Sequence, residues 1–166
     1  MSSGRDPSGL DDLYQTLILE HNKSPRNFRR LDDATGHAEG RNPLCGDHYD
    51  VWIKVEGEQV ADAAFLGNGC AISKASASMM TQAVKGKPVA EVREMFERFH
   101  DLVTTGSTEA GPLPSKLEVF KGVRAFPIRV KCATLSWHAM KAALDAEPRV
   151  DEPVVSTEEP GDRTVG

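Results

Sequence analysis

The sequence has 166 residues, of which 39% are hydrophobic and 27% are charged, and its formal net charge is −5. This length and this balance predict one globular domain with a hydrophobic core. The negative charge argues against a general nucleic-acid binder or a binder of anionic membranes. No apolar run approaches the length of a membrane span, and residues 1–6 lack the apolar core of a signal peptide. We therefore expect a cytoplasmic protein.

Helical and strand periodicities follow one another in the first half of the chain. Apolar residues at helical spacing predict a helix over residues 10–21. Residues 35–41 are interpreted as a short edge strand, although their glycines weaken that pattern. Apolar and polar residues alternate over residues 49–55, and a turn then leads into a return strand over residues 60–66. These three segments predict a small antiparallel sheet.

The second half of the chain is dominated by helical patterns. Helices are predicted over residues 70–84, over residues 88–103, around residues 117–123, and from Cys132 onward. The expected fold class is α+β, a small three-stranded antiparallel sheet packed by helices, in one domain spanning residues 8–146. Residues 147–166 are rich in proline and acidic residues, which predicts a disordered acidic tail.

The three cysteines, Cys45, Cys70 and Cys132, are an odd number, which fits poorly with a disulfide framework. A single cysteine would most often be a buried apolar residue. Here, however, Cys45 and Asp47 flank Gly46 in a tight loop, and the other two cysteines are predicted to stand at helix starts. There the macrodipole favours a thiolate. Three thiols and one carboxylate are what a four-coordinate zinc site of the Cys₃Asp type needs.

Other motifs are absent from the sequence. There is no C-x-x-C pair, so a rubredoxin-like or zinc-ribbon module is excluded as a motif match, and there is no Gly-rich phosphate loop of the P-loop type. His37, His48 and His138 lie near the cysteines in the sequence. Nothing in their spacing favours any of them over Asp47 as a ligand, so we interpret them as ordinary polar residues.

Four separated stretches agree, in order, with one known family. They are residues 13–15 with 21–27, residues 42–47, residues 69–81, and residues 129–137. In these stretches the chain resembles the SufU-type members of the IscU/NifU-N-like proteins of iron–sulfur cluster assembly. Classical IscU scaffolds carry a histidine immediately before the third cysteine, where this chain has Lys131. The longer segment between Cys70 and Cys132 is also typical of the SufU group.

The resemblance implies an IscU-like fold and a functional site. It implies a partnership with a SufS-type cysteine desulfurase, a pyridoxal-phosphate enzyme, and with downstream cluster assembly proteins. Cys45 would be the catalytic thiol that receives sulfur from the desulfurase persulfide, and Arg129 would lie at the docking surface. Beside them, we infer that Lys131 supplies positive charge near the incoming sulfur. The implied zinc ligands are Cys45, Asp47, Cys70 and Cys132.

Three functions compete at this stage. The first is a zinc-dependent sulfurtransferase, hence an enzyme, that relays persulfide sulfur. The second is a scaffold on which the same cysteines carry a transient iron–sulfur cluster, since such clusters are held mainly by cysteine thiolates. Lys131 in place of histidine argues against the scaffold. The third is a structural zinc site in a protein-binding module, which the short glycine-containing loop at Cys45 disfavours.

Overall fold

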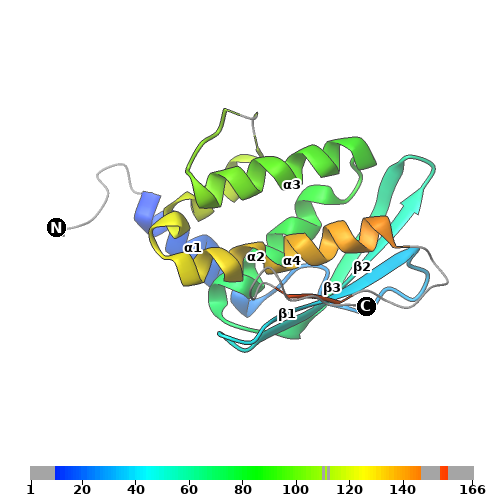
Figure 1. Cartoon of the computed structure of the whole chain (residues 1–166), viewed down its shortest axis with the longest axis horizontal. Helices are drawn as coiled ribbons and strands as arrows, with labels where there is room; N and C mark the ends of the chain where they lie inside the picture. Colours follow the sequence, from blue (N-terminus) through cyan, green and yellow to red (C-terminus); the bar gives the residue numbers. More distant parts are fainter. Residues whose placement is uncertain (1–9, 110, 112, 147–153, 157–166) are drawn as a thin grey trace.

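The computed structural model describes residues 10–109, 111, 113–146 and 154–156. The predicted start of the domain at residue 8 lies outside these ranges, as does most of the tail predicted over residues 147–166. Figure 1 shows a sheet with helices packed on one of its faces. The elements in chain order are α1 (Leu10–Lys23), β1 (Gly36–Asn42), β2 (Asp47–Glu56), β3 (Gln59–Asn68), α2 (Ala71–Val84), α3 (Val89–Thr104), the 3₁₀ helix η1 (Ser115–Ala125), α4 (Pro127–Asp145) and β4 (Val154–Ser156).

The sheet has the strand order β3-β2-β1-β4, and β2 pairs antiparallel with both β1 and β3. The predicted α+β fold with a three-stranded antiparallel sheet packed by helices is therefore confirmed. A fourth strand, β4, runs parallel to β1 and pairs Glu39 with Val154 and Arg41 with Ser156. Residues 154–156 of the predicted tail thus pair with β1 as a short parallel strand.

The alternation of residues along β2 divides its side chains between the two faces of the sheet. Tyr49, Val51 and Ile53 are fully buried in the main core, between the sheet and the helices. On the outer face, Trp52 packs with Leu31 and Ala64 in a second, smaller hydrophobic cluster. Both faces are thus partly covered, as the large apolar side chain of Trp52 predicts.

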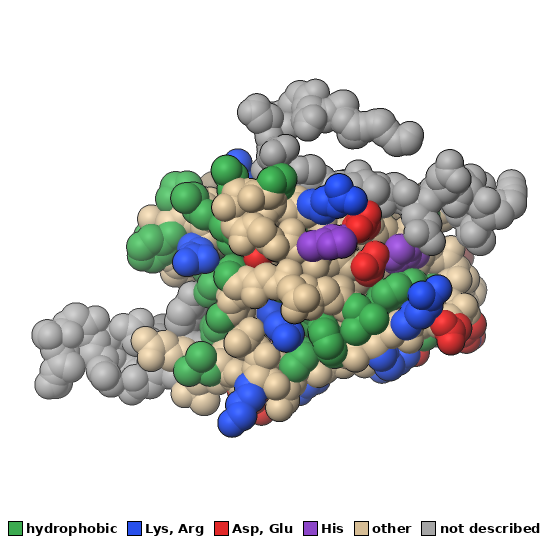
Figure 2. Space-filling model, turned by 90° about the horizontal axis from the view of Figure 1, so that it is seen from below, with side chains coloured by type: hydrophobic (Ala, Val, Ile, Leu, Met, Phe, Trp, Pro, Cys, Tyr) green, Lys and Arg blue, Asp and Glu red, His purple; other side chains and the backbone are tan. Residues whose placement is uncertain are grey.

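Histidine and acidic side chains pair across β1 and β2 on the outer face, which Figure 2 shows from the sheet side. His37 Nε2 lies 2.9 Å from Asp50 Oδ1, and His48 forms a hydrogen bond with Glu39. The ring of His37 also stacks on Trp52, with 4.8 Å between the ring centroids. His37 and His48 therefore have the ordinary polar roles that were predicted for them.

The glycines that weaken the strand pattern of β1 allow α4 to pack closely against it. A Cβ atom at Gly36 would collide with the carbonyl oxygen of Ala143, and one at Gly40 would lie 3.1 Å from Leu135 Cδ1. Glycine in a strand interior often marks such a close approach. The strand predicted over residues 35–41 is confirmed as β1, and the approach of α4 explains its composition. Its predicted position at the edge of the sheet is wrong, because β4 pairs with its other side.

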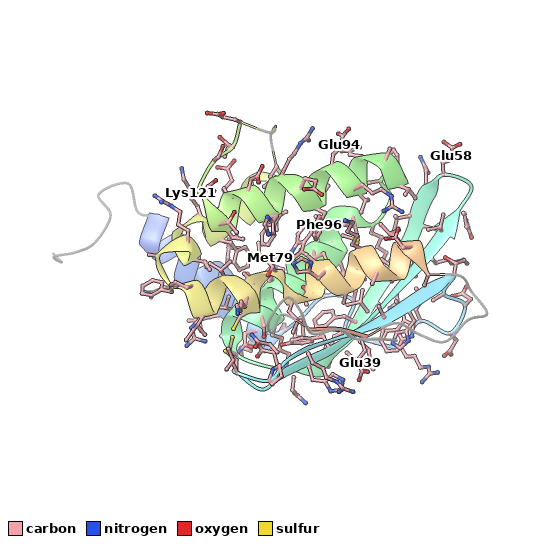
Figure 3. All side chains as sticks on the ribbon, viewed as in Figure 1. Glu39, Glu58, Met79, Glu94, Phe96 and Lys121 are labelled. Carbon is pink, nitrogen blue, oxygen red and sulfur yellow. The ribbon has the colours of Figure 1, made fainter. Side chains whose placement is uncertain are left out.

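The helices form two layers above the sheet. Helices α2 and α4 pack directly on the strands, and α3 lies beyond α4 (Figure 1). The rings of Phe99 and Trp137 stack between α3 and α4 at a centroid distance of 4.4 Å. Figure 3 shows Phe96 on the side of α3 that faces α4 and Glu94 on the opposite side. None of the helices within the described ranges combines the length and the apolarity that crossing a bilayer requires.

Candidate metal centre

Cys45 lies in a four-residue loop that joins two paired strands. Asn42, the last residue of β1, is directly opposite Asp47, the first residue of β2. The backbone N–H groups of Cys45 and Gly46 both donate to the carbonyl oxygen of Asn42, at 3.1 and 2.8 Å. Gly46 has a φ angle of +76°, in the left-handed region that glycine adopts without strain. The tight loop predicted from Gly46 is therefore confirmed, and it carries the thiol and the carboxylate on one turn.

Cys70 is the N-cap residue of α2, as the predicted helix start requires. Its Sγ accepts a hydrogen bond from the backbone N–H of Ser73 at 3.4 Å. Its own N–H donates to Asp47 Oδ1 at 2.9 Å. This second bond connects the start of α2 to the carboxylate on the Cys45 loop.

Cys132 does not stand at a helix start, and that prediction is wrong. Helix α4 begins at Pro127, so Cys132 lies in its second turn, fully buried. Proline is well suited to the first helical position because it lacks the N–H that has no partner there. The sequence pattern placed the helix start too late, because residues 127–131 carry few core-facing apolar side chains.

The structure brings Cys45, Asp47 and Cys132 together. One ligand atom from each lies within 4.8 Å of the others, and the Sγ atoms of Cys45 and Cys132 are 3.3 Å apart. Cys70 lies outside this group of three, but its N–H donates to Asp47, which belongs to the group. Among the described residues, no histidine belongs to the group.

Two buried oxygen atoms near the thiols have no hydrogen-bond partner among the residues that the structure describes. They are Asp47 Oδ2 and Asn42 Oδ1. Buried polar atoms are almost always paired, so an unpaired carboxylate oxygen beside sulfur ligands needs an explanation. Zinc takes sulfur and carboxylate ligands in tetrahedral sites, so this donor set fits a zinc ion.

The two thiols on helices differ in their acidity. The pKa of Cys70 is lowered to about 5, first by the hydrogen bond from the Cys132 thiol and also by the N–H of Ser73. The pKa of Cys132 is raised, first by its hydrogen bond to Cys70 and then by burial. Of the pair, Cys70 is thus the more acidic thiol. This again differs from the expectation that both helix-borne thiols are acidic, because Cys132 is buried in the second turn of α4 and burial raises its pKa.

The two predicted partner-binding residues lie on the first turns of α4. The charge on Cys70 and a hydrogen bond to Cys132 raise the pKa of the Arg129 guanidinium, which places this exposed cation beside the thiols. Lys131 directly precedes Cys132 and is half-buried. Three large apolar side chains are exposed at the start of α4 and in the Cys45 loop: Phe126 by 61% and Ile128 by 56% at the start of α4, and Leu44 by 67% in the loop.

Comparison with known proteins places the chain in a family. The model of the NifU-like N terminal domain family matches residues 13–149. The chain belongs to this family. It is 41% identical over 140 residues to the zinc-dependent sulfurtransferase SufU of Bacillus subtilis (strain 168), covering 84% of this chain and 95% of that protein. It is 38% identical over 137 residues to the iron–sulfur cluster assembly scaffold protein IscU of Streptococcus pyogenes serotype M1, covering 82% and 86%.

The fold of this IscU/NifU-N-like protein is also found in solved structures. The crystal structure of the N-terminal part of a nitrogen-fixing NifU-like protein from Brucella abortus superposes with a TM-score of 0.70 at 26% identity, covering 82% of this chain and 94% of that one. The family resemblance and the IscU-like fold predicted from the sequence are thus confirmed. The names of the two relatives describe different activities, sulfur transfer and scaffolding, within iron–sulfur cluster assembly.

Three residues of the centre were not singled out from the sequence. Asn42 Nδ2 lies 4.0 Å from Cys132 Sγ and donates toward it. Tyr49 and Ser73 form a hydrogen bond 2.8 Å long beside Cys70. Burial raises the pKa of Tyr49, so its hydroxyl keeps its proton at neutral pH. The sequence shows Tyr49 only as an apolar strand position and Ser73 only as a small helix residue, so neither pattern distinguished them from core residues.

Proposed function

We propose that this protein is a zinc-dependent sulfurtransferase that accepts persulfide sulfur from a SufS-type cysteine desulfurase for iron–sulfur cluster assembly. The observation that carries the proposal is the position of Cys45. It is half-buried on a loop whose neighbours Leu44 and Gly46 are exposed, whereas Cys132, 3.3 Å away from sulfur to sulfur, is fully buried. Cys45 is therefore the thiol of this pair that a partner protein can reach.

The proposed zinc ligands are Cys45, Asp47, Cys70 and Cys132. When bound, zinc would keep the thiols deprotonated at neutral pH. The contacts that prepare this site are within the chain: Asp47 Oδ1 is held by the N–H of Cys70, and Asp47 Oδ2 remains free to bind. Asn42 Nδ2 donates toward Cys132 Sγ at 4.0 Å, so an amide from the end of β1 faces that sulfur.

Sulfur transfer at Cys45 would follow thiol–disulfide exchange chemistry. The Cys45 thiolate attacks the outer sulfur of the persulfide on the desulfurase, forming a new S–S bond at Cys45. The S–S bond in the desulfurase persulfide breaks, and the cysteine of the desulfurase leaves as a thiolate. Arg129 and Lys131 would attract the anionic persulfide, and the exposed apolar side chains of Leu44, Phe126 and Ile128 would contact the desulfurase.

The variant Cys45→Ser tests the assignment of the acceptor thiol. We expect it to accept no ³⁵S from a SufS-type desulfurase supplied with labelled cysteine, and to lose the stimulation of desulfurase turnover that the unmodified protein produces. A serine hydroxyl has the size of the thiol but is not a nucleophile toward persulfide at neutral pH. Retained stimulation in Cys45→Ser would remove Cys45 from this role.

A scaffold function is the second candidate, favoured by the names of the IscU relatives and by the thiol-rich donor set. Metal and acid-labile sulfide analysis of protein purified without oxygen separates the two functions. One zinc per chain, no sulfide and faster desulfurase turnover support the sulfurtransferase. Iron with stoichiometric sulfide and unchanged turnover support the scaffold.

A further inference from the structure

Tyr49 lies on the inner face of β2, two residues after Asp47 and therefore on the same side of the strand. Its side chain is fully buried and its ring packs 5.9 Å from that of Phe65, measured between centroids. A phenylalanine would fill this part of the core equally well. The hydroxyl is the only group that distinguishes Tyr49 from an ordinary core residue, and it ends beside the metal centre.

The hydrogen bonds around Ser73 have a defined direction. The Ser73 hydroxyl has one hydrogen and donates it to the carbonyl oxygen of Cys70 at 3.0 Å. The Tyr49 hydroxyl, 2.8 Å away, must therefore be the donor in its bond to Ser73 Oγ. Ser73 also donates its backbone N–H to Cys70 Sγ at 3.4 Å. Ser73 thus contacts Cys70 at both the carbonyl and the sulfur, and Tyr49 holds Ser73 in place.

The space around Gly69 shows how closely these groups approach one another. A Cβ atom on Gly69 would lie 2.5 Å from Ser73 Oγ and 2.6 Å from Tyr49 Oη, and it would collide with Asp47 Oδ1. The two hydroxyls and the carboxylate therefore surround one backbone position. Since Asp47 Oδ1 also accepts the N–H of Cys70, the carboxylate and the Cys70 turn are held at a fixed separation.

We propose that Tyr49 is a positioning residue of the metal centre, whose hydroxyl acts through Ser73 to hold the Cys70 sulfur in place relative to Asp47. This inference rests on the metal site of the proposed function and is independent of sulfur transfer. Residues that hydrogen-bond to metal ligands orient those ligands before the metal binds. Removal of such a residue typically weakens metal affinity by about 10- to 100-fold.

The test compares the metal affinities of hydroxyl-deleted variants. In the full-length protein, Tyr49→Phe should weaken zinc binding about tenfold, measured by competition with a chromophoric chelator. It should also change the visible absorption of the Co²⁺-loaded protein. Ser73→Ala should weaken binding at least as much. The double variant should bind zinc no more weakly than Ser73→Ala alone, because Tyr49 acts only through Ser73.

Ser78→Ala is the matched control, because Ser78 is a buried serine on the same helix that binds His21 and the N–H of Arg26 instead of the site. It should lower the midpoint of unfolding and leave zinc affinity within twofold of the unmodified protein. Unchanged zinc affinity in Tyr49→Phe, additive losses in the double variant, or an equal loss in Ser78→Ala would each overturn the proposal. A protein whose zinc affinity depends on Tyr49 but which accepts no sulfur would overturn the proposed function alone.

Discussion

Two clusters of buried and half-buried polar residues in this protein differ in how fully their hydrogen bonds are satisfied. The first lies between α1 and α2 and comprises His21, Arg26, Asn27, Ser78 and Thr81; we call it the α1–α2 junction. Its bonds are short: His21 Nδ1 to Ser78 Oγ at 2.7 Å, Arg26 N to Ser78 Oγ at 2.8 Å, and Asn27 Nδ2 to Thr81 Oγ1 at 3.0 Å. The α1–α2 junction is completed by the chain itself.

The second cluster is the metal centre, which the chain leaves incomplete. Asp47 Oδ2 and Asn42 Oδ1 are buried and have no partner among the described residues, and two sulfur atoms approach to 3.3 Å. A buried polar atom without a partner lowers stability by about 1–3 kcal/mol. The difference shows that the hydrogen bonds of the α1–α2 junction serve the stability of the fold. The metal centre, in contrast, keeps unpaired ligand atoms that fit a bound metal ion.

Zinc should therefore stabilise the protein by binding at the metal centre, and the α1–α2 junction should not contribute to this stabilisation. This is the largest change in the free energy of unfolding that we expect. With free zinc at about 1,000 times its dissociation constant, the free energy of unfolding should rise by about 4 kcal/mol. Asp47→Ala should lose most of this gain, and Thr81→Val, which changes the α1–α2 junction, should keep it. Urea unfolding with and without zinc measures both. An equal gain in Asp47→Ala would contradict the distinction between the clusters.

A side chain added at Gly69, beside the metal centre, should cause the next largest change in the free energy of unfolding. Gly69→Ala would push a methyl group against Asp47, Ser73 and Tyr49, so it should lower the free energy of unfolding by about 3 kcal/mol and weaken zinc binding. Gly122→Ala is the control, because a Cβ atom there meets no atom within 4 Å. Thermal unfolding and chelator competition provide the two measurements. Equal behaviour of the two alanine variants would show that the packing around Gly69 is unimportant.

Acid should destabilise the metal-free protein through the buried His21 and the half-buried His138, and this effect should be smaller than the two above. Burial lowers the pKa of His21, and burial lowers the pKa of His138 to about 4. The unfolded chain, with histidine pKa values of about 6.5, therefore binds more protons than the folded chain below that pH, and stability falls as the pH drops from about 6.5 toward 4. At pH 5 the loss through His138 alone should be about 2 kcal/mol.

Urea unfolding of the chelator-treated protein at pH 7.5 and pH 5 measures this loss. His138→Gln should reduce the difference in stability between the two pH values, because glutamine does not titrate. An unchanged difference in that variant would show that His138 does not contribute. Treatment with chelator is needed because protons also compete with metal for thiolates, and that competition would add a pH dependence from the metal centre.

Much of the fold was predictable because its signals are local. The period-2 pattern of β2, the helical spacing in α1 and α3, and the glycine of the Cys45 loop each depend on residues close together in the sequence. The loop also places Cys45 and Asp47 together without any long-range contact. The family followed from four motifs in order, and the family model that matches residues 13–149 confirms it.

Only the tertiary structure decided which distant residues meet. It placed Cys132 in the second turn of α4 instead of at its start, explained the glycines of β1 by the approach of α4, and added β4 to the sheet. It also brought the Tyr49 hydroxyl to Ser73, a bond between residues that the sequence presents only as core positions. The physical reason is the same in each case. Periodicity shows which face of an element is buried, whereas the partner on the other side of that face is set by packing between segments far apart in the chain.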